Sequence, residues 1–75
     1  MAKSRRERFE DVAGKRVQYV LNKLELLGNC SNRNNYQYEP EDVRKMFSAI
    51  RDALKRAEAK FDGELTKHDK TKFKF

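Results

Sequence analysis

The chain has 75 residues, of which 18 are Lys or Arg and 12 are Asp or Glu, giving a formal net charge of +6. Such a short chain buries only a modest core, and its single cysteine and single histidine exclude an intramolecular disulfide and an ordinary zinc site. We therefore expect no metal or other cofactor, and stability gained from self-association as a homodimer or from a protein partner.

Apolar stretches in the chain are short. None approaches the roughly 18 apolar residues that suggest a membrane span, and the charged run after Met1 is unlike a signal peptide. A single cysteine also fits a reducing compartment. The sequence therefore predicts a cytoplasmic protein without membrane association. It forms one domain over residues 1–75, with flexible basic ends at 1–6 and 67–75.

The first periodic segment predicts a helix over about residues 7–27. Apolar residues recur there at gaps of three and four, which places them on one helix face. This stripe consists of Phe9, Ala13, Val17, Val20, Leu24 and Leu27. Gly28 stands where a left-handed residue commonly ends a helix, so we expect the helix to stop there.

The connection, about residues 28–39, is rich in asparagine, which tolerates left-handed backbone angles and bonds its own backbone in turns. Its asparagines are Asn29, Asn32, Asn34 and Asn35. We expect Cys30 to be a small residue buried under the turn. Tyr36 and Tyr38 either pack over the end of a helical hairpin, the favoured interpretation, or stack on nucleic-acid bases.

The second helix is predicted over about residues 40–66. Pro40 suits the first helical position, and Glu41 and Asp42 complement the helix dipole in the first turn. The main apolar stripe consists of Val43, Phe47, Ile50, Leu54, Ala57, Phe61 and Leu65. A second row beside it, Met46, Ala49 and Ala53, makes the face wider than one partner helix requires.

These elements predict an all-α antiparallel helical hairpin, since a connection of about ten residues makes two helices antiparallel neighbours. The wide face of the second helix suggests dimerisation into a four-helix bundle. A loose basic tail should follow, in which Phe73 and Phe75 are candidate anchors for a partner.

The net charge lies at the two ends of the sequence. Residues 1–8 and 67–75 each carry +3, while residues 9–66 sum to zero. Solvated tails are one explanation, and a phosphate-binding pole at one end of the hairpin is the other. Arginines at the positive end of a helix dipole favour the second. The candidate nucleic-acid-binding residues are Lys3, Arg5, Arg6, Arg8, Lys67, Lys70, Lys72 and Lys74.

No arrangement of residues suggests catalysis, because the sequence has no nucleophile-and-base pattern and no glycine-rich phosphate loop. We expect no enzyme activity and no small-molecule substrate. The leading hypothesis is a non-catalytic accessory protein that binds nucleic acid through its basic ends. The alternative is a module that binds or inhibits a larger protein. Its candidate contact residues are Arg33, Tyr36, Tyr38, Met46, Ala49, Ala53, Phe73 and Phe75.

Two runs carry a resemblance to known proteins: Leu26-Leu-Gly-Asn-Cys-Ser-Asn-Arg-Asn-Asn-Tyr-Gln-Tyr and Glu41-Asp-Val-Arg-Lys-Met-Phe-Ser-Ala-Ile. Over about residues 5–61 the chain resembles short uncharacterised basic helical proteins encoded on plasmids, integrative elements and phages of Gram-positive bacteria. The resemblance implies a mobile-element context, such as a DNA transfer or replication accessory, a regulator, or a small inhibitor of host defence. It carries over no functional residues.

Overall fold

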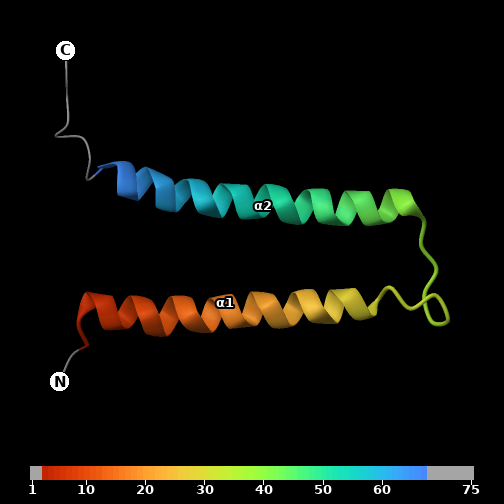
Figure 1. Cartoon of the computed structure of the whole chain (residues 1–75), viewed down its shortest axis with the longest axis horizontal. Helices are drawn as coiled ribbons and strands as arrows, with labels where there is room; N and C mark the ends of the chain where they lie inside the picture. Colours follow the sequence, from red (N-terminus) through yellow and green to blue (C-terminus); the bar gives the residue numbers. More distant parts are fainter. Residues whose placement is uncertain (1–2, 68–75) are drawn as a thin grey trace, which may run out of the picture. The chain divides into compact units, whose positions relative to one another are not determined.

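The computed structural model describes residues 3–67, which form two α-helices, α1 (Arg5–Asn29) and α2 (Pro40–Lys67) (Figure 1). No strand occurs in this range, so the prediction of an all-helical chain is confirmed for it. The order of helix, connection and helix is consistent with a helical hairpin. The chain divides into two compact units, one ending at residue 37 and containing α1, the other beginning at residue 38 and containing α2.

Helix α1 begins two residues earlier than predicted. Ser4 is its N-cap, so Arg5 and Arg6, which we had assigned to a flexible end, are helical. The helix also extends past Gly28 to Asn29, and no described residue has a positive φ. The expectation that Gly28 would end the helix in a left-handed conformation was therefore wrong. A right-handed glycine costs about 1 kcal/mol relative to alanine, and the ordinary helical hydrogen bonds around it outweigh that cost.

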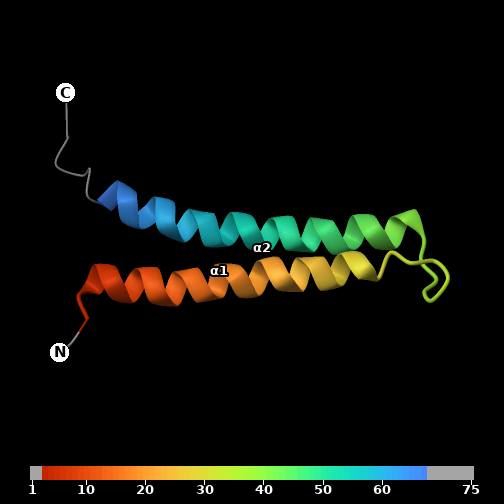
Figure 2. The same cartoon turned by 60° about the horizontal axis from the view of Figure 1, so that its bottom comes forward.

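Helix α2 begins at Pro40, as predicted. The backbone N–H of Glu39 donates to Oδ2 of Asp42 at 2.8 Å, and the N–H of Asp42 donates to the Glu39 carbonyl at 2.9 Å. These bonds fix the first turn, in which Glu41 and Asp42 lie at the positive end of the dipole. The helix then runs unbroken to Lys67 (Figure 2), one residue beyond the predicted end.

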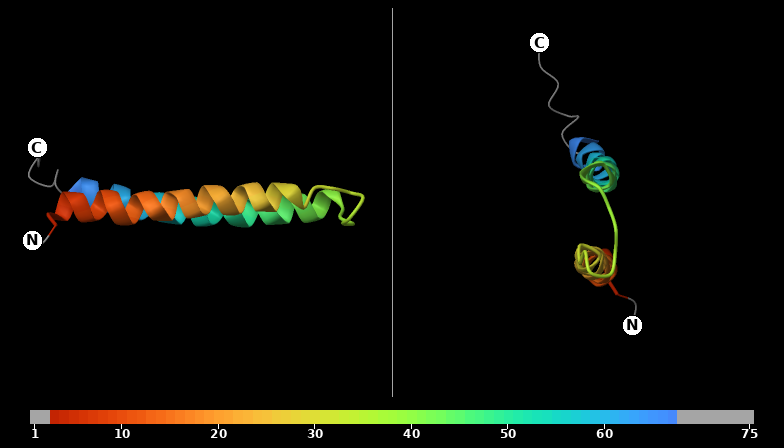
Figure 3. Two further views of the ribbon diagram at one scale, coloured as in Figure 1. Left: turned by 90° about the horizontal axis from the view of Figure 1, so that it is seen from below. Right: turned by 90° about the vertical axis from the view of Figure 1, so that its right-hand side faces the viewer.

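No residue among those described is buried, which is the main structural difference from a compact globular domain. Each unit has a single helix (Figure 3), and its apolar stripe stays open to solvent within that unit. Val43 and Ile50 of α2 are half-buried, and its other large apolar residues range from 36% exposed at Phe47 to 65% exposed at Leu65. Because burial of apolar surface is the main driving force for folding, these stripes require a covering surface.

Candidate nucleic-acid and partner surfaces

The start of α1 is fixed by a reciprocal capping box. The N–H of Ser4 donates to Oε1 of Glu7 at 3.0 Å, and the N–H of Glu7 donates to Oγ of Ser4 at 3.1 Å. The pKa of Glu7 lies below its ordinary value, chiefly because the Ser4 backbone N–H stabilises the carboxylate, with the Ser4 side chain contributing second. The start of α1 is therefore fixed locally, by Ser4 and Glu7.

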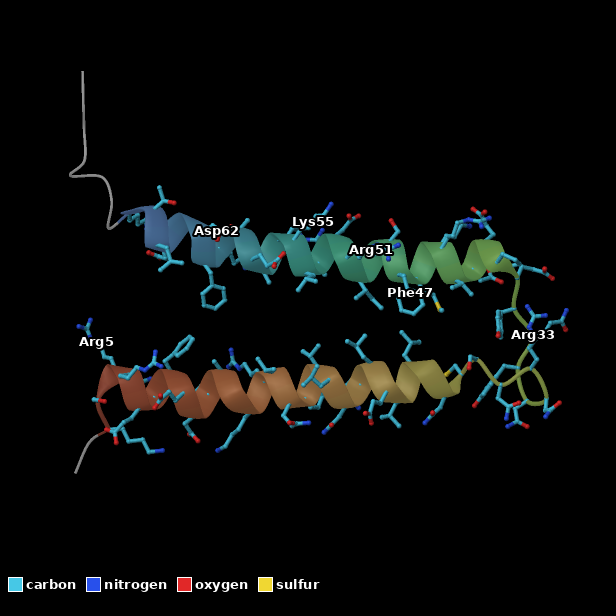
Figure 4. All side chains as sticks on the ribbon, in the orientation of Figure 1. Arg5, Arg33, Phe47, Arg51, Lys55 and Asp62 are labelled. Atoms are coloured by element: carbon cyan, nitrogen blue, oxygen red, sulfur yellow. The ribbon has the colours of Figure 1, made fainter. Side chains whose placement is uncertain are left out.

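Because α1 begins at Arg5, Arg5 and Arg6 lie in its first turn and Arg8 follows directly after that turn. The helix dipole is positive there, so cations are disfavoured. Arg6 is compensated by Glu10, at 3.3 Å, and lies 5.8 Å from the centre of the Phe9 ring. Arg5, labelled in Figure 4, and Arg8 have no ion pair with any of residues 3–67. These two guanidinium groups are the most available cations at this end.

Lys3 and Lys15 share one carboxylate. Nζ of Lys3 lies 3.5 Å from Oδ2 of Asp11, and Nζ of Lys15 lies 3.4 Å from Oδ1. Pairs this exposed contribute about 0–1 kcal/mol, so a phosphate can compete for Lys3 at little cost. Lys3 thus lies at the same end of α1 as Arg5 and Arg8.

Of the predicted C-terminal cations, only Lys67 lies in the described range. It is the last residue of α2, not part of a flexible end, and its Nζ lies 3.5 Å from Oε2 of Glu64. Lys70, Lys72 and Lys74 lie outside the described residues, as do the candidate anchors Phe73 and Phe75.

The connection is organised by Asn32. Its Oδ1 accepts from the N–H of Asn34 at 2.9 Å, and its carbonyl accepts from the N–H groups of Asn35 at 3.1 Å and Tyr36 at 3.0 Å. The side-chain bond is the asparagine turn that the composition predicted. Arg33 sits at the tip of this turn (Figure 4). Tyr36 is 52% exposed and Tyr38 is half-buried, so they are not equivalent as contact residues.

Cys30 is exposed, so the expectation that it would be buried under the turn was wrong. It follows the last residue of α1, and its Sγ donates to the carbonyl of Leu26 at 3.8 Å. The cause of the error is the helix end, because a helix that continues to Asn29 makes Cys30 its C-cap.

The predicted partner-binding row of α2 is accessible within its unit. Met46 is 39% exposed, and Ala49 and Ala53 are also exposed. By helical spacing they lie beside the apolar stripe, of which Phe47 is labelled in Figure 4. The small alanine side chains allow a second backbone to approach closely, while Met46 adapts to irregular surfaces. This row is the candidate surface for a protein partner or a second copy.

The sequence prediction missed one set of charged residues, in the middle of α2. Between Val43 and Phe61 there are six basic and two acidic residues, a net charge of +4. Acids at both ends of α2 cancel this charge in a sum over residues 9–66. Summing the charge over each turn of the predicted second helix, in place of the whole range 9–66, would have revealed this basic stretch.

No group of three or more His, Cys, Asp or Glu side chains in residues 3–67 is placed to bind a metal ion. Neither α1 nor α2 combines the length and the apolar character that crossing a bilayer requires. Comparison with known proteins found no family model, curated protein or solved structure that matches the chain.

Proposed function

We propose that the protein is a non-catalytic, cytoplasmic accessory of a Gram-positive mobile genetic element that binds nucleic acid through its basic ends. The observation that carries this proposal is the position of Arg5 and Arg8. The Ser4–Glu7 capping box places both in the first turns of α1, without an ion pair to any described residue. A phosphate group offers them the anionic partner that the helix lacks.

A cation near the positive end of a helix costs about 0.3–1 kcal/mol, whereas an acidic residue there contributes a similar amount. Arg5 and Arg8 thus weaken the helix that presents them. Arginine also binds phosphate in a bidentate manner, so the same two residues are well suited to a nucleic-acid backbone.

A hairpin would unite the two basic ends. In the proposed fold α1 and α2 are antiparallel neighbours, their apolar stripes face each other, and a second copy completes a four-helix bundle. Each hairpin then brings residues 3–8 close to Lys67 and to the basic residues that follow it. Several phosphate contacts from one pole give binding that falls steeply with salt.

The proposal is tested by titrating a labelled DNA duplex and a single strand at about 50 mM and about 200 mM salt. The expected result is binding at the lower salt that weakens strongly at the higher one. A variant in which Arg5, Arg6, Arg8, Lys70, Lys72 and Lys74 are all replaced by Gln should lose most of the affinity. Absence of binding at the lower salt, or unchanged binding by this variant, would overturn the proposal.

A second candidate function is favoured by the open apolar row of Met46, Ala49 and Ala53. Here either the face of α2 or the connection, with Arg33, Tyr36 and Tyr38, binds a larger protein, such as a host-defence or transfer protein. Capture from a nuclease-treated Gram-positive lysate distinguishes the two. A partner retained by the native chain and lost by Ala49→Glu supports this candidate, while loss of every partner after nuclease treatment contradicts it.

A further inference from the structure

The charge on α2 is segregated along its length. Four of its six acidic residues lie at the two ends, Glu41 and Asp42 in the first turn and Asp62 and Glu64 near the last. The middle, which contains Asp52 and Glu58, still carries +4. Asp62 is labelled in Figure 4 toward the C-terminal end of the helix. At about 1.5 Å per residue, the basic stretch is roughly 25 Å long.

The six cations form two rows along the helix. In a helix with 3.6 residues per turn, side chains four, seven or eleven residues apart lie on nearly the same face. The residues of one row are seven and four positions apart, and those of the other are eleven and four positions apart. The first row is Arg44, Arg51 and Lys55, and the second is Lys45, Arg56 and Lys60. Between the rows lie the short side chains of Ser48, Asp52 and Ala59. Figure 4 shows Phe47, of the main apolar stripe, and Lys55 leaving α2 in different directions. Ala49, four residues after Lys45 and seven before Arg56, lies in the second row.

Helix stability accounts for only part of this arrangement, since Lys45 follows Glu41 and Arg56 follows Asp52 at the favourable spacing of four residues. Among the six cations, only Arg44 has an ion pair within residues 3–67, with Glu41 at 3.0 Å. Arg51 and Lys55 are four residues apart, as are Arg56 and Lys60, and like charges at this spacing destabilise a helix. The two rows thus present cations that neighbouring residues leave available.

We infer that the face between these rows is a second nucleic-acid contact, docking in the major groove of duplex DNA. This inference rests on the proposed nucleic-acid binding and adds its substrate class. A helix about 10–12 Å across fits a groove about 12 Å wide. With Ser48 and Ala59 toward the groove floor, the rows that contain Arg51 and Arg56 face the phosphates of the two strands.

The chemistry of this face selects duplex DNA among nucleic acids. It has no aromatic residue on which the bases of a single strand would stack, because Phe47 and Phe61 belong to the apolar stripe. Duplex RNA is disfavoured because its major groove is deep and narrow. Asp52, the acid between the rows, opposes the phosphates and lowers affinity.

The test compares Arg51→Gln/Lys55→Gln with Lys15→Gln/Lys23→Gln, which removes the same charge from α1. Glutamine is a good helix former, and circular dichroism checks that both variants stay helical. Neutralising two phosphate contacts should lower the slope of log K against log salt by about 1.8 for duplex DNA. The matched control should change it much less, and Asp52→Asn should tighten binding.

The possible results separate groove docking by α2 from nucleic-acid binding by the chain as a whole. If the native chain binds DNA but the Arg51/Lys55 variant behaves like its control, the inference is overturned while the proposed function stands. If the native chain does not bind DNA at about 50 mM salt, both fail. Equal affinity for a single strand, duplex RNA or polyglutamate overturns groove docking, because only a generic polyanion site would remain.

Discussion

At the start of α1, the side chains of Ser4 and Glu7 each accept a hydrogen bond from the other's backbone N–H. The nitrogen-to-oxygen distances are 3.0 Å from Ser4 to Glu7 and 3.1 Å from Glu7 to Ser4. This pair fixes where the helix begins and therefore how Arg5 and Arg8 are presented. The proposed function depends on that presentation, so the capping box is the first feature to test.

Replacing Ser4 with Ala should destabilise α1 by about 1 kcal/mol, because the N–H of Glu7 loses its acceptor. Amide hydrogen exchange at Glu7 and Arg8, whose N–H groups donate to Ser4, should accelerate. Ser48→Ala, in the middle of α2, is the matched control and should leave those amides unchanged. Equal exchange in the two variants would show that the cap does not hold the helix start.

The helix start should also depend on pH. The folded-state pKa of Glu7 is lowered by the hydrogen bonds from Ser4. The stability it contributes is therefore fully present above the unfolded pKa and is lost as the pH falls through the folded one. Titration of Glu7 by NMR should give a pKa below its ordinary value. Ser4→Ala should raise that pKa only in part, because the backbone N–H of residue 4, the larger cause, is retained. A Glu7 pKa at its ordinary value in the native chain would contradict the assignment.

Replacing Gly28 with Ala should stabilise α1 by about 0.5–1 kcal/mol. Gly28 is helical with no positive φ. Apart from its chain neighbours and the adjacent helix backbone, nothing lies within 4 Å of the position that an alanine Cβ would occupy. The measurement is thermal unfolding followed by circular dichroism, with Gly14→Ala as a mid-helix comparison. Destabilisation by Gly28→Ala alone would indicate that Gly28 is left-handed after all.

Asn32→Ala should destabilise the connection by about 0.5–1.5 kcal/mol, because it removes the side-chain acceptor of the Asn34 N–H. Asn34→Ala is the matched control, since its own N–H donates the bond and remains. Chemical shifts of Asn35 and Tyr36 should change in the first variant and stay near native in the second. Similar changes in both would exclude a specific turn at Asn32.

The helices themselves were predictable because apolar periodicity and Pro40 are strong local signals. Their ends were less so. The prediction gave weight to Gly28 and overlooked the reciprocal bond between Ser4 and Glu7, although both residues are visible in the sequence at capping-box spacing. Cys30 was misplaced for the same reason, since its exposure follows from the true end of α1.

The candidate site was predictable only in part. Composition located the basic ends, but which cations are paired depends on side-chain geometry, and this separates Arg6, held by Glu10, from Arg5 and Arg8. The basic rows of α2 that contain Arg51 were missed because summing charge over residues 9–66 conceals a helix that is acidic at its ends and basic in its middle.

The most direct test of the proposed function compares Arg5→Gln/Arg8→Gln with Lys15→Gln/Lys23→Gln in salt titrations of a labelled DNA duplex. The Arg5/Arg8 variant should lower the salt slope by about 1.8, whereas the control should change it little. It should also make α1 more stable, since two cations leave the positive end of the dipole. Identical salt slopes for the two variants would contradict phosphate binding by Arg5 and Arg8.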